Sequence, residues 1–423
     1  MRKPLAFVLL VGGLIVAVRA AAGAPVRVAQ FGDNPGNLEM WTYSPRSAGA
    51  RAPLVVVLHG CTQQASSMAP GGFEALADER GFHVLYPQQK SDNNPVGCFN
   101  WAGEYGDPAN LERGKGENRS IISMVETMKE AHSIDPARVY VIGFSAGGGF
   151  AAVLLATWPD VFAAGAMAAG VPYRCATDQQ GAFDCMNLST HPDRKRTPRA
   201  WGDLVRSGYP AWDGSWPRVM IIQGSADYTV HPDAADELVE QWTNVHGIDG
   251  SANDTVEIAG HRRAQFMSGG SVAVESWRIE GMGHAFPIGA GDPEHGCGQV
   301  AAYFEDRGLC GAYRALEFFD LSGGGDGGDD GDEGDGGDSG GGGDGGDGDS
   351  GDPDGDGGGG GCRVAGGGGS GGSGASSSPS YGSLLVLIAA AIRIARRRRS
   401  PRSTLPAPVR GNSATSSKRR GSL

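Results

Sequence analysis

A short stretch near the middle of the chain has the pattern that activates a serine. GFSAG at 143–147 is a G-x-S-x-G motif, preceded by the apolar run 139–142 and followed by a helix-like stretch at 146–158. This order is typical of a sharp strand-to-helix turn that exposes the serine hydroxyl. Glycines suit the flanking positions because a Cβ there would collide with the neighbouring strand and helix. We therefore predict that Ser145 is a nucleophile at a helix N-terminus, where free N–H groups can stabilise an oxyanion.

Two residues downstream complete the set of side chains that a serine nucleophile needs. Asp227 follows the apolar, strand-like run 218–224, and His284 follows the alternating segment 271–279 on a glycine-containing loop. An imidazole takes the serine proton, and a carboxylate fixes the imidazole tautomer and stabilises the imidazolium. Alone, Asp227 could cap a helix and His284 could be a surface residue. Together they follow the α/β-hydrolase order of serine, aspartate and histidine, which predicts a catalytic triad.

A β-branched run at 54–58 leads into His59, Gly60 and Cys61. Such a run suits a central parallel strand that is buried on both faces. The His-Gly pair at its end resembles the oxyanion-loop motif of esterases, so we expect the backbone N–H groups of Cys61 and Ala146 to be the oxyanion donors. We place His59 beside the substrate as the residue that orders this loop, not as the base.

Several spaced segments resemble the polyhydroxybutyrate depolymerase family of extracellular esterases, which is similar to the feruloyl and acetylxylan esterases of carbohydrate esterase family 1. These segments are VVVLHGCTQ (55–63), GCFNW (97–101), RVYVIGFSAGG (138–148), WPDVFAAGAMAAGVPY (158–173), QGSADYTVHP (223–232) and GMGHAFP (281–287). The resemblance spans residues 27–320. Polymer-degrading members often carry a separate polymer-binding module, and no segment here resembles one, which leaves activity on crystalline polyester open.

The resemblance implies a fold, an activity and a set of site residues. The implied fold is the α/β-hydrolase fold, and the implied activity is ester hydrolysis. The implied residues are Ser145 as nucleophile, Asp227 as acid, His284 as base, Cys61 and Ala146 as oxyanion donors, and Trp101 near the substrate cleft.

Strand-like and helix-like segments alternate between these motifs. We expect strands at 82–86 and 161–168, and helices at 120–132 and 234–245 with apolar residues at helical spacing. This alternation predicts one large domain with a doubly wound, mostly parallel sheet and helices on both faces. We expect the stretch 173–217 to be irregular and to cover the active site as a loop-rich cap. Its tryptophans belong either to the local core or to a binding wall: Trp201, Trp212 and Trp216.

The catalytic region contains an even set of cysteines: Cys61, Cys98, Cys175, Cys185, Cys297 and Cys310. An even set in an exported chain suggests disulfides, although buried thiols are the alternative and many pairings are open. We expect Cys175–Cys185 and Cys297–Cys310, which close short loops, and Cys61–Cys98, which would tie the oxyanion loop to 97–101. The sequence has no C-x-x-C pair or Cys/His cluster with zinc spacing, so we predict no catalytic metal and no cofactor.

The N-terminal segment 1–24 is typical of a secretory signal peptide. Two basic residues precede the apolar stretch 5–18, and the small-residue run 20–24 offers a cleavage site after Ala22 or Ala24. A membrane anchor is the alternative, but the apolar stretch is short for a bilayer. The first 24 residues therefore predict export.

Residues 322–361 are almost only glycine and aspartate, with 13 acidic residues and no basic one. Such a segment cannot bury apolar area, which predicts a flexible, self-repelling linker. It lacks the aliphatic residues of a calcium-binding β-roll and the closing glutamate of an EF-hand. The whole chain has a formal net charge of −12, which argues against a nucleic-acid partner.

The C-terminal segment 362–423 begins at Cys362 and continues through a Gly/Ser stretch, the apolar run 384–394 and the arginine cluster 396–399. It resembles the C-terminal sorting signal of myxobacterial surface proteins. The resemblance implies processing and lipid attachment near Cys362, with the arginines on the cytoplasmic side. A simple tail anchor or a soluble basic tail is the alternative. We expect sorting machinery and membrane as partners, and a location at the outer cell surface.

These observations predict a secreted serine esterase that works through an acyl-enzyme. The expected substrate is poly(3-hydroxybutyrate) or its oligomers. The alternative is a feruloyl or acetylxylan esterase acting on plant polysaccharide. A surface-binding module on an inactive hydrolase fold is a third reading, which the intact set of Ser145, Asp227 and His284 disfavours.

Overall fold

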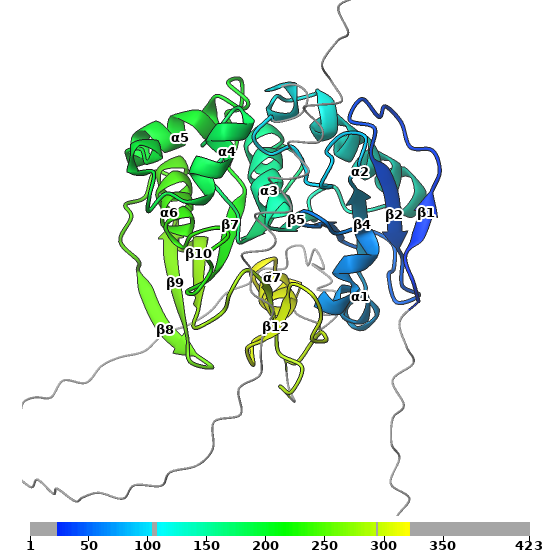
Figure 1. The fold of residues 1–423 in the computed structure, drawn as a ribbon. Helices are drawn as coiled ribbons and strands as arrows, with labels where there is room; N and C mark the ends of the chain where they lie inside the picture. The colour runs from blue at the N-terminus through cyan, green and yellow to red at the C-terminus, as the bar shows by residue number, and fades with distance from the viewer. Residues whose placement is uncertain (1–22, 104–107, 293–294, 322–423) are drawn as a thin grey trace, which may run out of the picture. The chain divides into compact units, whose positions relative to one another are not determined.

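The computed structural model describes residues 23–103, 108–292 and 295–321. The predicted signal peptide (apart from residues 23 and 24), the Gly/Asp-rich linker and the segment that contains Cys362 lie outside the described residues. Within them the chain forms a ten-stranded sheet with the order β1-β2-β4-β3-β5-β6-β7-β10-β9-β8 (Figure 1).

The centre of the sheet is parallel and its edges are antiparallel. The parallel strands, in sheet order, are β4 (His83–Gln88), β3 (Leu54–Leu58), β5 (Val139–Phe144), β6 (Ala164–Ala168), β7 (Arg218–Gly224) and β10 (Ser271–Ile279). The edge strands are β1 (Val26–Val28) and β2 (Glu39–Tyr43) on one side, and β9 (His261–Ser268) and β8 (Asp254–Ile258) on the other. The predicted doubly wound, mostly parallel sheet is confirmed.

Helices cover both faces of this sheet (Figure 1). Leu54, Val56 and Leu58 of β3 pack in one hydrophobic cluster with α2 (Gly116–His132), α3 (Ala146–Thr157), α5 (Pro198–Arg206) and α6 (Asp233–Val245). Val55 and Val57 point to the opposite face, where they pack in a second cluster with α1 (Phe73–Arg80) and α7 (Gly311–Phe318). Successive strand residues face opposite sides, so the β-branched run of β3 contributes to both halves of the core.

The predicted elements are present, with shifted ends. The strands expected at 82–86 and 161–168 are β4 and β6, and the helix expected at 234–245 is α6. The helix expected at 120–132 is α2, which begins earlier, at Gly116. Its first turn is stabilised from outside the helix because Asn110 Oδ1 accepts the Glu117 N–H at 2.9 Å. Apolar spacing does not reveal such a contact.

The expectation that 173–217 is irregular is wrong. This stretch contains α4 (Gln179–Met186), the short helix η3 (Pro192–Arg194) and α5. Side chains cap both α-helices: Asp178 accepts from the Gly181 N–H, and Thr197 accepts from the Ala200 N–H. Trp201 of α5 is fully buried and donates to Glu237 of α6 at 2.6 Å. Trp201 therefore belongs to the core, while Trp212 and Trp216 are partly buried.

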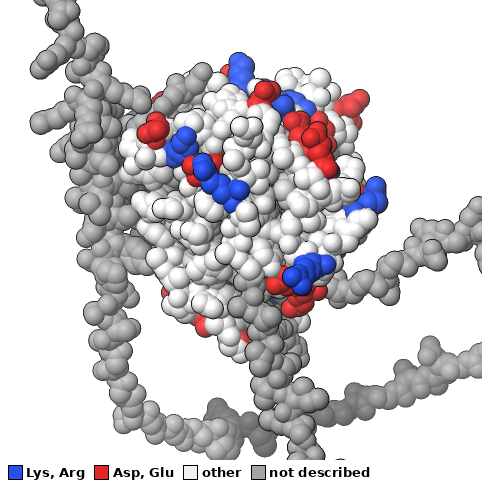
Figure 2. Space-filling model, turned by 90° about the vertical axis from the view of Figure 1, so that its right-hand side faces the viewer, with Lys and Arg blue, Asp and Glu red and all other residues white. Residues whose placement is uncertain are grey.

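The remaining elements complete the body. A small parallel pair is formed by β11 (Phe286–Ile288) and β12 (Phe304–Asp306), and short helices lie at η1 (Ala65–Gly71) and η2 (Pro108–Leu111). None of the helices in the described part of the chain combines the length and apolar character that a membrane span needs. On the face shown in Figure 2, acidic and basic side chains lie in small mixed groups.

The described residues contain the disulfides Cys61–Cys98, Cys175–Cys185 and Cys297–Cys310. These are the pairs that we expected. Stable disulfides form in oxidising compartments outside the cytoplasm, so the disulfides agree with export. Cys61–Cys98 joins two segments that lie 37 residues apart in the sequence, next to the candidate active site.

The exported protein should have no free thiol in its catalytic region. Alkylation of the denatured protein before reduction should leave all six cysteines of the pairs unlabelled, and alkylation after reduction should label all six. The double exchange of Cys61 and Cys98 to serine should lower the free energy of unfolding by about 2–5 kcal/mol. Mass spectrometry and denaturant unfolding measure the two results. Labelling of Cys61 before reduction would contradict the first pair.

Candidate active site

Ser145 occupies the turn between β5 and α3 in a backbone conformation that residues other than glycine rarely adopt. Its φ is 56° and its ψ is −119°, a sparsely populated region that needs support from the surrounding structure. The Ser145 N–H donates to the carbonyl of Ala168 on β6 at 2.8 Å. A Cβ on Gly143 would overlap the backbone of Gly147, and a Cβ on Gly147 would overlap the carbonyl of Leu58. The two glycines therefore allow the close packing that holds the strained serine.

The structure brings the predicted triad residues together from three strand ends. His284 Nε2 lies 2.9 Å from Ser145 Oγ, and His284 Nδ1 lies 2.8 Å from Asp227 Oδ2. Asp227 and His284 are buried, whereas Ser145 is partly exposed. A histidine that donates from Nδ1 to a carboxylate leaves Nε2 free to accept a hydroxyl proton. The arrangement can therefore generate a nucleophilic serine.

Asp227 is fixed by further donors. Its Oδ1 accepts the backbone N–H groups of Thr229 at 2.8 Å and Val230 at 2.9 Å. Its Oδ2, which faces His284, also accepts from Gln223 Nε2 at 3.2 Å. Donors on every side match a carboxylate, which only accepts hydrogen bonds. Sequence reasoning missed Gln223, although a polar residue inside the apolar run 218–224 was a usable signal.

The loop that carries His284 is held by the C-terminal part of the domain. Glu305 of β12 accepts the Gly283 N–H at 3.2 Å. The Tyr303 ring is nearly perpendicular to the His284 ring, with 6.4 Å between the ring centres, and the centre of the Phe144 ring lies 5.0 Å from that of His284. Sequence reasoning also missed Glu305 and Tyr303, because no motif surrounds them.

The loop after β3, residues 59–63, lies against Ser145; we call it the oxyanion loop. A Cβ on Gly60 would lie 3.2 Å from Ser145 Cβ, so a larger residue here would force the loop and the serine to shift. The Gly60 N–H is already used by Gln63 Oε1 at 2.8 Å. Cys61 is the next residue, and Ala146 is the first residue of α3, where N–H groups have no intrahelical partner. Ala146 follows Ser145 in the chain, and Cys61 follows Gly60, which packs against Ser145. Their N–H groups are therefore candidates for the oxyanion donors.

His59, the first residue of the oxyanion loop, is buried and does not point to a surface where a substrate could bind. Its Nδ1 donates to the Gly60 carbonyl at 2.7 Å, and its Nε2 accepts the Gln89 N–H at 3.1 Å. Burial lowers the pKa of His59 to about 4, so the ring is neutral. With both ring nitrogens in use and no exposed surface, His59 orders the loop. It has no polar atom left for a substrate.

Trp101 is only 7% exposed and packs on α3. A Cβ on Gly149 would lie 3.0 Å from Trp101 Cγ, so this small residue makes room for the indole ring. Trp101 therefore supports the helix that begins at the nucleophile.

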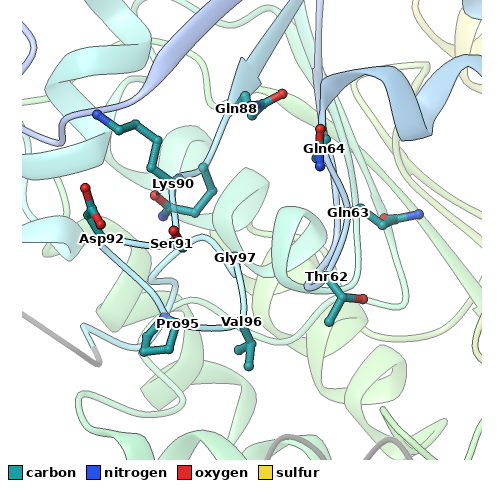
Figure 3. A pocket seen from close by; sticks show the side chains of 11 residues that line it. Thr62, Gln63, Gln64, Gln88, Lys90, Ser91, Asp92, Pro95, Val96 and Gly97 are labelled. Atoms are coloured by element: carbon teal, nitrogen blue, oxygen red, sulfur yellow. Dashed lines mark hydrogen bonds between the residues drawn. The ribbon is translucent and has the colours of Figure 1, made fainter. Parts of the chain in front are cut away.

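A cavity of about 510 Å³ lies beside the oxyanion loop. Figure 3 shows that its wall comes from two segments, Thr62 to Gln64 and Gln88 to Gly97. Most of the lining side chains are polar, including Lys90 and Asp92. In the described part of the chain, no group of three or more His, Cys, Asp and Glu side chains is arranged to hold a metal ion.

A buried carboxyl group lies under the same region. Glu117, in the first turn of α2, is 1% exposed, and burial raises its pKa from 4.5 to about 7. Between these two values the folded protein binds a proton that the unfolded chain has released. Stability should therefore fall as the pH rises through this range.

When the pH rises from about 4 to about 8, the unfolding free energy of the wild type should fall by about 3 kcal/mol more than that of Glu117→Gln. The reason is that glutamine has no charge to bury. Denaturant unfolding at several pH values measures the difference. Glu257→Gln, at an exposed position of β8, is the control and should keep the wild-type pH dependence. Parallel curves for wild type and Glu117→Gln would contradict the prediction.

Known proteins are similar to this chain in sequence. The family model described as "Esterase PHB depolymerase" matches residues 39–266. Poly(3-hydroxyalkanoate) depolymerase C of Paucimonas lemoignei is 45% identical over 325 residues, which cover 76% of this chain and 76% of that protein. Feruloyl esterase B of Neurospora crassa is 33% identical over 281 residues, which cover 66% of this chain and 94% of that protein.

A solved structure has the same fold. Acetyl xylan esterase from Aspergillus awamori matches with a TM-score of 0.58 and 25% sequence identity, over 71% of this chain and 100% of that chain. The family match covers more than half of the sequence and includes Ser145 and Asp227. The sequence identity, the topology and these matches establish that the chain belongs to the esterase PHB depolymerase family and is a carboxylic ester hydrolase with the α/β-hydrolase fold.

Proposed function

We propose that this chain is a secreted serine esterase that hydrolyses poly(3-hydroxybutyrate) or its oligomers. The main support for the proposal is the pair of hydrogen bonds that link Ser145 to His284 and His284 to Asp227. The 45% identity to a poly(3-hydroxyalkanoate) depolymerase supports a polyester as the substrate.

The reaction follows from the geometry in two steps. Ser145 Oγ attacks the ester carbonyl carbon while His284 Nε2, 2.9 Å away, takes its proton. The backbone N–H groups of Cys61 and Ala146 stabilise the oxyanion. His284 then gives the proton to the departing alcohol, which leaves an acyl group on Ser145. In the second step water attacks the acyl carbon while His284 takes its proton. His284 then returns this proton to Ser145 Oγ as the bond between Oγ and the acyl carbon breaks, which releases the acid and restores the serine.

A second function has support from the cavity beside the oxyanion loop. Its lining, which includes Gln63, Gln88 and Ser91, is mostly polar and offers hydrogen bonds to hydroxyl groups. Relatives with 33% identity are named feruloyl esterase and acetylxylan esterase. Hydrolysis of esters on a plant polysaccharide is therefore the alternative.

A substrate panel separates the two functions. The panel contains poly(3-hydroxybutyrate) granules, hydroxybutyrate oligomers, methyl ferulate and acetylated xylan, and Ser145→Ala is the control for each. We expect release of 3-hydroxybutyrate from the oligomers or granules with the highest kcat/KM of the panel. Faster release of ferulate or acetate, without release of 3-hydroxybutyrate, would favour the polysaccharide esterase.

We also propose a division of the whole chain. Segment 1–24 directs export, residues 27–320 form the esterase domain, segment 322–361 links it to the C-terminal part, and the segment from Cys362 onward holds the enzyme at the cell surface. Leu321 packs with the domain as well: it is buried, its N–H donates to the Leu316 carbonyl at 2.8 Å, and its carbonyl accepts from Arg80 at 3.1 Å. The folded domain therefore extends through Leu321, one residue beyond the expected end at 320.

A chain that ends at Leu321 should be released into the medium. It should keep the wild-type kcat/KM on p-nitrophenyl butyrate, because the triad and its supporting contacts lie before this residue. Cell fractionation of the full-length and shortened chains measures the location. Recovery of the full-length chain from the medium, with Cys362 intact and unmodified, would contradict the anchoring.

A further inference from the structure

We propose that Glu117 is a positioning residue that sets the place of the oxyanion loop through Gln89. This inference rests on the proposed function, because it concerns the stabilisation of the oxyanion in ester hydrolysis. Glu117 does not contact the reacting atoms. It acts through buried hydrogen bonds that lead by one route to Gly60, which packs against Ser145, and by another to Cys98, whose disulfide reaches Cys61.

Glu117 is the acceptor at the centre of these hydrogen bonds. Its Oε1 accepts from Gln89 Nε2 at 2.6 Å and from Asn100 Nδ2 at 2.5 Å, and its Oε2 accepts from the Asn100 N–H at 2.9 Å. All three contacts come from N–H donors of these two residues, which suits the two oxygens of a carboxylate. A glutamine at position 117 would turn an N–H group toward one of these donors, and that contact would be lost.

Gln89 connects Glu117 to the oxyanion loop along two routes. Its backbone N–H donates to His59 Nε2 at 3.1 Å, and His59 Nδ1 donates to the Gly60 carbonyl at 2.7 Å. Its side-chain Nε2 also donates to the Cys98 carbonyl at 3.0 Å, and Cys98 is bonded to Cys61. A displaced Gln89 would therefore shift the oxyanion loop both at Gly60 and at the side chain of Cys61, the proposed donor.

These hydrogen bonds can affect catalysis because oxyanion stabilisation depends strongly on distance. Donors work when they lie 2.7–3.1 Å from the developing oxyanion, and a displacement of about 1 Å can cost about 10²-fold in rate. A buried carboxyl also costs stability that an apolar residue would not. Replacing Glu117 should therefore have two separate effects: a change in the stability of the fold, and a fall in kcat because the oxyanion loop moves.

The test compares Glu117→Gln with wild type on p-nitrophenyl butyrate at about pH 8. We expect kcat to fall about 10- to 100-fold while KM changes less than about 3-fold, because the transition state alone carries the oxyanion. Inactivation by a p-nitrophenyl phosphonate, which forms an anionic adduct on the serine, should slow by a similar factor. Cooperative thermal unfolding confirms that the variant is folded.

Two further variants keep the proposal falsifiable. Gln89→Met removes the same side-chain link, so it should also lower kcat, and the loss in the double variant should be less than the product of the two single losses. Glu74→Gln is the matched control: Glu74 is also a buried carboxyl but bonds Tyr86 at 2.9 Å, and it should keep the wild-type kcat.

Wild-type kcat in folded Glu117→Gln would overturn the proposal. If that variant does not fold, wild-type kcat in Gln89→Met would overturn it. The same assay includes wild type and Ser145→Ala. Hydrolysis by wild type and its loss in Ser145→Ala test the serine-esterase chemistry itself, so a failure of the proposed function is recognised separately.

Discussion

Replacing Ser145 with alanine should abolish ester hydrolysis and leave the fold intact, with kcat falling on the order of 10⁶-fold. In the proposed mechanism the Ser145 hydroxyl oxygen forms the acyl-enzyme, so His284 and Asp227 would have no reacting group to act on without it. Alanine keeps the Cβ, and the hydrogen bond from the backbone N–H to the Ala168 carbonyl does not involve the side chain. The proposed oxyanion donors would remain, so we expect a small residual rate over water.

Hydrolysis of p-nitrophenyl butyrate and thermal unfolding measure this prediction. Ser189→Ala is a matched control because Ser189 is exposed and lies outside the site. It should keep full activity. A folded Ser145→Ala variant that retains more than a few per cent of the activity would exclude Ser145 as the nucleophile.

Replacing Asp227 with asparagine should lower kcat about 10⁴-fold. Asp227 accepts hydrogen bonds on both oxygens, from Thr229 and Val230 on one side and from Gln223 and His284 on the other. An asparagine must turn its NH₂ group toward one of these sides. If the NH₂ group faces His284, the Nδ1 atom becomes the acceptor and the ring proton moves to Nε2. The imidazole can then no longer take the serine proton.

The steady-state constants test this reasoning. The loss should appear in kcat, with little change in KM, because the exchange removes transition-state stabilisation. Asp213→Asn, at an exposed position, serves as the control and should behave as wild type. A raised KM with unchanged kcat would mean that Asp227 binds substrate instead of orienting the histidine.

The sequence was most informative where a local pattern has one physical solution. The apolar runs of β3, β5 and β7 suit strands that are buried on both faces, and the structure has them there. The turn with glycines at 143 and 147 has one geometry, which the observed φ of Ser145 confirms. The three polar residues at strand ends also meet as predicted, because parallel strands bring their carboxyl ends to the same edge of the sheet.

The contacts that support the site were not predictable in the same way. Glu305, Gln89 and Glu117 lie outside any recognisable motif and act through partners far away in the sequence. Helices α4 and α5 were missed because their capping residues stand in a stretch rich in proline and tryptophan. Only the packed fold shows that Trp201 bonds Glu237, so its place in the core required the structure.

Covalent labelling tests the central claim most directly. The full-length enzyme is incubated with a p-nitrophenyl phosphonate, and peptide mass spectrometry then locates the adduct. A triad built on Ser145 predicts one adduct, on the peptide that contains Ser145, and loss of ester hydrolysis in step with labelling. Ser145→Ala should remain unlabelled. An adduct on another residue that accompanies complete inactivation, or full hydrolysis by enzyme labelled at Ser145, would contradict the mechanism.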